Sequence, residues 1–281
     1  MCGAYIAVII AAGLSSRMGK FKPLIDVGGK AALFRLLDTI EASGLKRAVV
    51  VTGHRHALIE AALRQYSSIF PSPAAITSSF DNNAVETTSF FGCSSPVTSS
   101  SSSYSAPAFA SSFSVGGLSV DTVYNAAYES GMFSSVQAGI RYITGKALTA
   151  GGNEAAVGKL SGEDLHAPAD DTRAALLFPA DVPLVSAETI CGLIFAYEQG
   201  ASSRFAVPVY EGKNGHPLLI PRKYFSEIID HTGEGGLKEI RNRHLGEMLR
   251  YEADDEGCVL DMDTPEDYEQ ILTYEKRQNE R

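Results

Sequence analysis

The sequence is poor in cysteine, in positive charge and in long apolar runs. Its four cysteines, Cys2, Cys93, Cys191 and Cys258, are scattered without a C-x-x-C pair, so neither a zinc site nor a disulfide framework is expected. Lysine and arginine number 24 against 33 acidic residues. The resulting net charge of −9 argues against a broad nucleic-acid-binding surface.

Signals for membrane insertion and export are also lacking. No apolar run approaches the length of a membrane span. The apolar stretch near the N-terminus is not preceded by the basic segment that is typical of a signal peptide. We therefore expect a cytoplasmic protein that binds neither nucleic acid nor a membrane.

The sequence does contain a regular alternation of strands and helices. Apolar, β-branched runs at residues 5–10, 47–52 and 174–178 predict buried strands, and helical periodicity is present at 31–43 and 55–66. This alternation is typical of an α/β fold with a Rossmann-like, doubly wound and mostly parallel sheet. In such sheets ligands bind beyond the carboxyl ends of the strands.

The loop after the first strand is a candidate phosphate-binding site. Its small residues Ala11, Ala12 and Gly13 leave backbone N–H groups open to an anion, and Arg17 and Lys22 add positive charge. The loop has neither the G-x-x-x-x-G-K-[ST] spacing nor the G-x-G-x-x-G spacing of other nucleotide-binding loops. Taken alone, the residues leave open an ordinary turn with solvated cations.

The segment A-A-G-L-S-S-R-M-G-K-F-K-P-L at residues 11–24 resembles the signature loop of the MobA-like nucleotidyltransferases, which include the molybdenum cofactor cytidylyltransferases. The resemblance implies a fold of the nucleotide-diphospho-sugar transferase type, in which this loop holds the nucleotide. Arg17 and Lys22 would then contact the triphosphate and stabilise the charge that moves onto pyrophosphate.

A second segment, V-Y-N-A-A-Y-E-S-G-M-F-S-S at residues 123–135, resembles another signature of the same family. The resemblance implies that Asn125, Gly131, Ser134 and Ser135 lie near the base and ribose. Without the resemblance, the two serines would be read as the capped start of a helix.

Two aspartates are candidate ligands for Mg²⁺. Asp181 follows the strand at 174–178, and a carboxylate at the end of a parallel strand points into the ligand crevice. A helix-capping role is the alternative, but Ser186 is the better cap for the next helix. The D-V-P and D-M-D-T-P-E-D-Y segments resemble family elements, and they imply that Asp181 and Asp263 bind the metal while Asp261 is structural.

Gly215, His216 and Pro217 form a turn that resembles the cytidylyltransferase branch of the family. The resemblance implies that this turn contacts the acceptor, whereas a generic turn histidine is the alternative. Ala12 points to the same branch, because guanylyl-transferring relatives usually have glycine there. A glycine-rich turn at residues 233–236 is expected to lie over the acceptor pocket.

The domain prediction is a single nucleotidyltransferase domain over residues 1–281 with low-order insertions at about 67–119 and 144–172. The first insertion is rich in serine, nearly uncharged and without a period. Order is expected to return with a short strand at 121–125 and a helical segment at 126–137.

The functional prediction is transfer of CMP from CTP to a phosphorylated acceptor, with pyrophosphate as the leaving group. Molybdopterin is the favoured acceptor and Mg²⁺ the expected cofactor, and contact with a molybdoenzyme or its chaperone is a further expectation. The catalytic candidates are Arg17, Lys22 and Asp181. Two alternatives remain, a sugar- or alcohol-phosphate nucleotidyltransferase and a non-catalytic nucleotide-binding protein.

Overall fold

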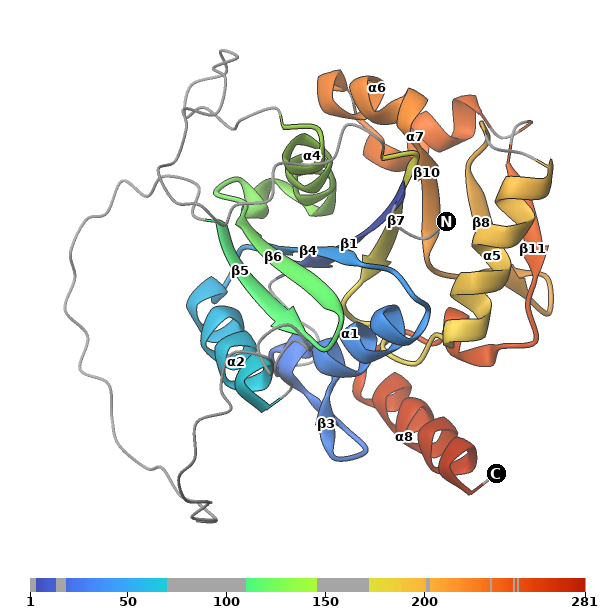
Figure 1. Ribbon diagram of the computed structural model, residues 1–281. Helices are drawn as coiled ribbons and strands as arrows, with labels where there is room; N and C mark the ends of the chain where they lie inside the picture. Colours follow the sequence, from blue (N-terminus) through green and yellow to red (C-terminus); the bar gives the residue numbers. More distant parts are fainter. Residues whose placement is uncertain are drawn as a thin grey trace, which may run out of the picture.

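The computed structural model describes residues 4–13, 19–69, 110–145, 172–200, 203–232, 234–244, 246 and 248–280 (Figure 1). Its centre is a nine-stranded sheet with helices on both faces. Among the described residues, no helix has the length and apolar character needed to cross a membrane.

The sheet is mixed but mostly parallel around its centre. Across the sheet the strands follow the order β11 (Leu249–Glu252), β8 (Ala206–Tyr210), β10 (Leu218–Pro221), β7 (Ala174–Pro179), β1 (Tyr5–Ala11), β4 (Arg47–Thr52), β6 (Leu118–Tyr124) and β5 (Ala110–Val115). β1 is parallel to both of its neighbours, whereas β10 and β5 run antiparallel to theirs. β9 (Lys213–Asn214) pairs with β8, and β2 (Asp26–Val27) forms a separate hairpin with β3 (Lys30–Ala31).

Helices cover both faces of this sheet (Figure 1). On one face lie α1 (Ala32–Ala42), α2 (His56–Ile69) and α5 (Ala187–Gly200). On the other lie α4 (Met132–Ile143), α6 (Phe225–Asp230) and α7 (Gly236–Arg243). The C-terminal α8 (Pro265–Asn279) packs near the β2–β3 hairpin, and the short helices are η2 (Lys22–Leu24), η3 (Tyr128–Ser130), η4 (Arg222–Tyr224) and η6 (Glu256–Val259).

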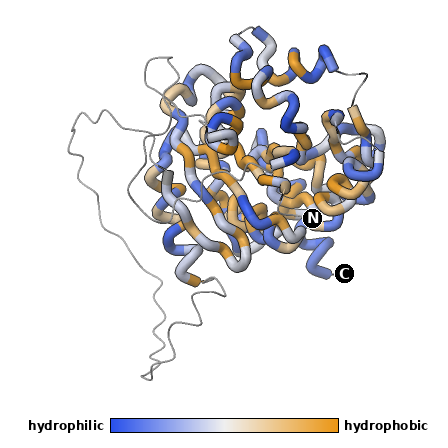
Figure 2. The backbone as a smooth tube through the Cα atoms, turned by 45° about the horizontal axis from the view of Figure 1, so that its top comes forward, coloured by the Kyte–Doolittle hydropathy of each residue, from blue (hydrophilic) through white to orange (hydrophobic). Residues whose placement is uncertain are grey.

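The central strand β1 is buried on both faces of the sheet. Its side chains point alternately into two hydrophobic cores, one on each face. Tyr5, Ala7 and Ile9 pack toward α1, α2 and α5, whereas Ile6 and Val8 pack toward α4 and α6. The backbone of the central strands is coloured mostly as hydrophobic, in agreement with this burial (Figure 2). The Rossmann-like α/β prediction is therefore confirmed, because helices cover both faces of a mostly parallel sheet. Parallel strands of this kind are apolar on both faces because both faces are buried.

The predicted limits of the first insertion were wrong. β5 and the start of β6 lie within residues 67–119, and their register pairs Phe113 with Val120. Both Phe113 and Val115 are buried, while serines alternate with them along an edge strand. This alternation is a strand pattern, but the serine-rich composition concealed it. The short strand expected at 121–125 is β6 itself, and the helix expected at 126–137 begins at Met132 and ends at Ile143.

The rest of both predicted insertions, residues 70–109 and 146–171, lies outside the described residues. The single-domain prediction over 1–281 therefore stays a prediction.

Candidate functional site

The candidate site is a cleft of about 290 Å³ at the carboxyl ends of β1 and β7. Backbone hydrogen bonds extend the sheet to this edge, because Ala180 N donates to Ile10 O at 3.1 Å and His54 N donates to Ala12 O at 3.3 Å. The cleft is lined by residues from the ends of β1 and β7, from η2 and from the η3–α4 turn: Ile10, Ala11, Ala12, Gly13, Lys22, Pro23, Tyr128, Glu129, Gly131, Met132, Ala180 and Asp181.

Lys22 joins the two aspartates that the sequence predicted as metal ligands. Its Nζ lies 3.2 Å from Oδ2 of Asp181 and 2.6 Å from Oδ1 of Asp263. The side chain of Lys22 is only 13% exposed and lines the cleft with Asp181, whereas that of Asp263 is 47% exposed and lies outside the lining. Three residues that are far apart in sequence thus meet at one point.

Local backbone structure brings Asp263 to Asp181. Met262 N donates to Asp181 O at 3.0 Å, which ties the segment before α8 to the end of β7. Thr264 then caps α8, accepting a hydrogen bond from Asp267 N while the Asp267 carboxylate accepts from Thr264 N. This capping box fixes the direction in which the chain leaves the cleft.

The electrostatics of this cluster favour a further cation. Burial lowers the pKa of Lys22, but hydrogen bonds and the charges of Asp263 and Asp181 outweigh it, so its pKa is raised. Burial, together with the charges of Asp263, Asp181 and Asp267, raises the pKa of Asp261. Among the described residues, three carboxylates, those of Asp181, Asp261 and Asp263, lie in this region, and the ammonium of Lys22 pairs with two of them.

The donor set fits Mg²⁺ with a nucleotide. Asp181 and Asp263 each direct an oxygen at the same point, which the ammonium of Lys22 marks. Nucleotide-bound Mg²⁺ needs only one or two protein carboxylates, because phosphate oxygens and waters complete its coordination. No cluster of three or more His, Cys, Asp or Glu ligands occurs in the described part of the chain.

The structure brings Asn125, Ser134 and Ser135 together, but none of them lines the cleft. The buried amide of Asn125 donates to both serine hydroxyls at 2.9 Å, and its Oδ1 accepts from Ala127 N at 3.0 Å. These bonds use the side chain of Asn125 to hold the η3–α4 turn. Contact with the base or ribose stays a prediction for these three residues.

The helix-capping alternative for the two serines was wrong. α4 begins at Met132 with Gly131 as its N-cap, and no side chain caps it. The φ of Gly131 is 110°, which favours glycine.

Sequence reasoning missed Tyr128, Glu129 and Met132, although they lie inside the predicted motif. They line the cleft on the turn that Asn125 holds. Gly53 at the end of β4 was also missed. A Cβ there would lie 2.5 Å from Cβ of Tyr128 and 2.9 Å from Cβ of Ala12, so only glycine lets these three backbones approach.

The Gly215–His216–Pro217 turn lies on the other side of Asp181. His216 N donates to Cys258 O at 2.8 Å, and a Cβ on Gly215 would lie 2.6 Å from the same oxygen. β10 pairs antiparallel with β7 through Leu218 and Leu177, so the residues before Leu218 run along the end of β7 toward Asp181. None of the three lines the 290 Å³ cleft, and their acceptor role stays a prediction.

Three further predictions concern Arg17, the glycine-rich turn before α7 and Ser186. Arg17 belongs to residues 14–18, which lie outside the described residues. The glycine turn before α7 has positive φ at Gly235 and Gly236, and a Cβ on Gly236 would lie 2.9 Å from Cγ of Phe133. The start of α7 therefore packs on α4 next to Met132. Ser186 caps α5 as expected, accepting from Thr189 N at 3.1 Å.

The fold of this chain is similar to that of solved structures. Nucleotidyl transferase from Methanothermobacter thermautotroptrophicus has a similar fold, with a TM-score of 0.60, 17% identity, and coverage of 98% of this chain and 99% of that one. The Rv0371C complex with manganese from Mycobacterium tuberculosis H37Rv gives a TM-score of 0.54 at 17% identity, covering 97% and 100%.

In sequence, the bifunctional IPC transferase and DIPP synthase of Thermococcus kodakarensis is 46% identical over 52 residues. These make up 18% of this chain and only 12% of that protein. The MobA-like NTP transferase domain family matches residues 7–79 and 83–248, which is most of the chain. The protein therefore belongs to the MobA-like NTP transferase domain family.

Proposed function

We propose that this protein transfers a nucleotidyl group, with CTP as the favoured donor, to a phosphorylated acceptor and releases pyrophosphate. The observation that carries the proposal is the contact of Lys22 with Asp181 and Asp263 beside the small-residue loop. This arrangement would combine a lysine that binds phosphate with two carboxylates that bind a metal. It lies at the carboxyl ends of β1 and β7.

The reaction would proceed by in-line displacement. An oxygen of the acceptor phosphate forms a bond to the α-phosphorus, the bond from that phosphorus to the bridging α–β oxygen breaks, and its electron pair leaves with pyrophosphate. Asp181 and Asp263 would hold Mg²⁺, which supplies orientation of the phosphates and neutralisation of their charge. Lys22, with Arg17, would stabilise the charge that develops on the leaving group.

The proposed preference for CTP rests on the crowding beside Ala12. The Ala12 side chain is 3% exposed, and the position of Gly53 leaves no room for a Cβ between Ala12 and Tyr128. Ala12 and Tyr128 both line the cleft, so the Cβ of Ala12 would take up room beside a base that binds there. This loss of room would favour a pyrimidine over a purine.

Molybdopterin is the proposed acceptor, because the Gly215–Pro217 turn resembles the cytidylyltransferase branch of the family. The second candidate is a sugar- or alcohol-phosphate acceptor, because one nucleotidyltransferase scaffold can serve either kind of acceptor and the fold does not fix which one it uses. A non-catalytic nucleotide-binding protein is disfavoured, since binding alone does not require two converging carboxylates and a lysine. Contact with a molybdoenzyme or its chaperone and a cytoplasmic location are parts of the same proposal.

The test is a screen of pyrophosphate release with each of the four NTPs and Mg²⁺. The acceptors are molybdopterin, myo-inositol 1-phosphate, glucose 1-phosphate and a blank without acceptor. We expect release that requires both CTP and molybdopterin. Pyrophosphate release with a sugar or alcohol phosphate, and not with molybdopterin, would show that molybdopterin is the wrong acceptor. No pyrophosphate release from any pair of nucleotide and acceptor would contradict the transferase proposal.

A further inference from the structure

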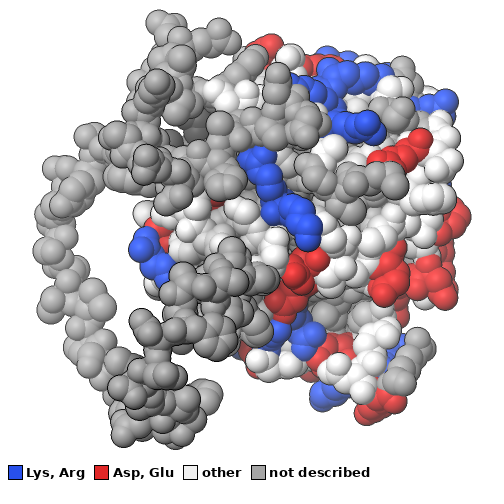
Figure 3. Space-filling view, in the orientation of Figure 1, with Lys and Arg blue, Asp and Glu red and all other residues white. Residues whose placement is uncertain are grey.

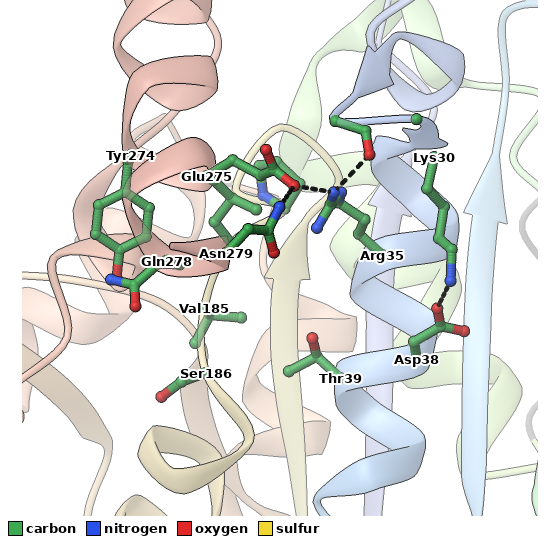
Figure 4. Close-up of a pocket in the computed structure, with 14 residues that line it drawn as sticks. Lys30, Arg35, Asp38, Thr39, Val185, Ser186, Tyr274, Glu275, Gln278 and Asn279 are labelled. Atoms are coloured by element: carbon green, nitrogen blue, oxygen red, sulfur yellow. Dashed lines mark hydrogen bonds and ion pairs between the residues drawn. The ribbon is translucent and has the colours of Figure 1, made fainter. Parts of the chain in front are cut away.

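A second pocket, which we call the α1–α8 pocket, is formed by the β2–β3 hairpin, α1, the segment between β7 and α5, and α8 (Figure 4). Its volume is about 440 Å³, against about 290 Å³ for the cleft, and the two share no lining residue among those the structure describes. Sites for small molecules typically enclose roughly 300–1,000 Å³. The pocket therefore has the size of a ligand site without being part of the cleft.

The charged side chains of this pocket are balanced in pairs. Lys30 pairs with Asp38, and Arg35 pairs with Glu275 (Figure 4). The side chains of Arg35 and Glu275 are 23% and 6% exposed, so this second pair is largely removed from solvent. Nδ2 of Asn279 also donates to the Glu275 carboxylate. A charged ligand would have to break one of these pairs or leave its own charge unbalanced, and both are costly in a partly buried site.

The charge on the visible surface near α1 and α8 is also mixed. Basic side chains gather over α6 and α7 in Figure 3, whereas acidic and basic side chains lie side by side over the part where α1 and α8 are found. A surface of one sign is what draws charged ligands to a cleft. The surroundings of the α1–α8 pocket therefore favour a neutral ligand.

Neutral hydrogen-bonding groups and apolar surface complete the lining. Thr39 on α1 and Ser186 before α5 approach from different walls, and no hydrogen bond joins the Thr39 hydroxyl to another lining residue (Figure 4). Gln278 lies on the α8 wall, and Leu184 and Val185 add apolar surface. Hydroxyl and amide groups both donate and accept hydrogen bonds. A carbon ring or chain with several hydroxyl groups matches this combination, because each of its hydroxyls also does both.

The walls of the pocket continue into the three residues that meet beside the cleft. The β2–β3 hairpin follows η2, which begins at Lys22. The segment from β7 to α5 contains Asp181 before it reaches the pocket, and α8 begins directly after Asp263 and its cap Thr264. Each residue of the lysine–aspartate contact is thus in the same stretch of chain as one wall of the pocket.

A small hydrophobic cluster joins these walls to one another. Met262 belongs to this cluster, and its backbone N–H donates to Asp181 O at 3.0 Å. Packed interiors transmit displacement, so a shift of one wall would move the segments that carry the metal-binding candidates. The cluster contains fully buried residues of the hairpin, α1, α8 and the segment before α8, with Leu184 packed against them: Val27, Ala32, Ile271 and Met262.

We propose that the α1–α8 pocket binds a small neutral polyhydroxy molecule, of the size of a monosaccharide or a cyclitol, and that this binding changes the affinity of the cleft for its nucleotide. The regulatory part rests on the proposed function, because it takes the cleft as the nucleotide site. Such coupling is reciprocal, so the nucleotide changes the affinity of the pocket for its ligand by the same factor.

The first test measures binding by saturation-transfer NMR. The probes are D-glucose and myo-inositol, with glucosamine and glucuronate as charged analogues of glucose. We expect a neutral probe to bind more tightly than either charged analogue. Thr39→Val should raise its Kd about two- to tenfold, as for loss of one neutral hydrogen bond. Gln278→Trp should fill the pocket and abolish binding, whereas Gln270→Trp, an exposed change on the same helix outside the lining, should leave the Kd unchanged.

Two results would overturn the site. One is failure of both neutral probes to bind the wild-type protein, and the other is equal binding by the wild type and a folded Gln278→Trp variant. Tighter binding of glucosamine or glucuronate than of glucose and myo-inositol would overturn the assignment to a neutral ligand.

The second test measures the Kd of CTP with Mg²⁺, with and without a saturating neutral probe. We expect the probe to change this Kd about fivefold or more in the wild type and not in Gln278→Trp, which keeps every residue that lines the cleft. An unchanged Kd in the wild type would overturn the regulatory role. If the wild type binds no nucleotide, the proposed function fails and the regulatory part fails with it, whereas the probe measurements still decide whether the pocket is a ligand site.

Discussion

Lys22 lies between two carboxylates that the chain brings together from the end of β7 and the start of α8. Two carboxylates that converge on one point repel each other, and the ammonium of Lys22 between them relieves that repulsion. In the proposed complex with a nucleoside triphosphate, the same ammonium would contact phosphate oxygens. The residue therefore has a structural role in one state and a proposed ligand-binding role in the other.

Ala12 carries the prediction on nucleotide choice. Ala12 lines the cleft, where its Cβ would take up space that a glycine would leave open to a bound base. We expect CTP to exceed GTP in kcat/KM by about ten- to two-hundredfold, the range for steric rejection in a pocket, and Ala12→Gly to reduce the gap. Competition kinetics with both nucleotides measure the ratio. Equal use of the two, or a preference for GTP in the wild type, would refute this account of specificity while leaving the transferase proposal in place.

The two described cysteines, Cys191 and Cys258, should differ in reactivity. Burial, followed by the charge of Asp255, raises the pKa of Cys258 to about 12. The thiolate is the reactive form, so at pH 8 Cys258 stays a protonated, buried thiol, whereas Cys191 is exposed. Brief treatment of the folded protein with iodoacetamide, read by peptide mass spectrometry, should label Cys191 and spare Cys258. Equal labelling of both would show that the segment around Cys258 opens.

At the scale of elements, α8 is attached to α1 and the β2–β3 hairpin by a charged contact (Figure 4). Arg35 of α1 donates to the carbonyls of Val27 and Gly28 and pairs with Glu275 of α8. Glu275 is only 5% exposed, and a Cβ on Gly28 would collide with it. These contacts border a pocket of about 440 Å³. They also position the helix whose first turn follows Asp263.

We expect Glu275→Ala to lower the free energy of unfolding by about 1–3 kcal/mol, because Arg35 would be left with a partly buried, unpaired charge. Glu269→Ala, an exposed change on the same helix, should have little effect. Urea denaturation of both variants gives the difference. If Glu275→Ala is as stable as Glu269→Ala, the contact does not stabilise the attachment of α8.

At the scale of the whole molecule, the features that could be predicted from the sequence are those that follow from a local pattern of apolar residues. The runs at β1, β4 and β7 are apolar on both faces, so the sheet and the edge where Lys22 and Asp181 meet could be predicted. Edge strand β5 was missed because serines alternate with its apolar residues, so that its composition resembles that of the serine-rich segment before it. Tyr128 and Gly53 were missed because their contact depends on how distant segments pack, which no local pattern specifies.

A pair of deletions tests the corrected limits of the first insertion. Replacing residues 70–109 with a short Gly/Ser linker should leave the melting temperature nearly unchanged, since the free energy of closing a flexible loop depends weakly on its length. Removing 67–119 should lower it clearly, because Phe113 and Val115 of β5 are buried. Thermal unfolding of both variants provides the comparison. Equal melting temperatures would mean that β5 adds nothing to the stability of the sheet.

The most direct test of the central claim, a metal-dependent transfer at the cleft, is the turnover of Asp181→Asn in Mg²⁺. Asparagine keeps the size of the side chain but loses the charge that a metal requires, so pyrophosphate release should fall by at least about a hundredfold. The melting temperature should stay close to that of the wild type. Asp254→Asn, an exposed change outside the cleft, should retain full turnover. An Asp181→Asn protein that is folded and keeps most of the wild-type rate would contradict the account.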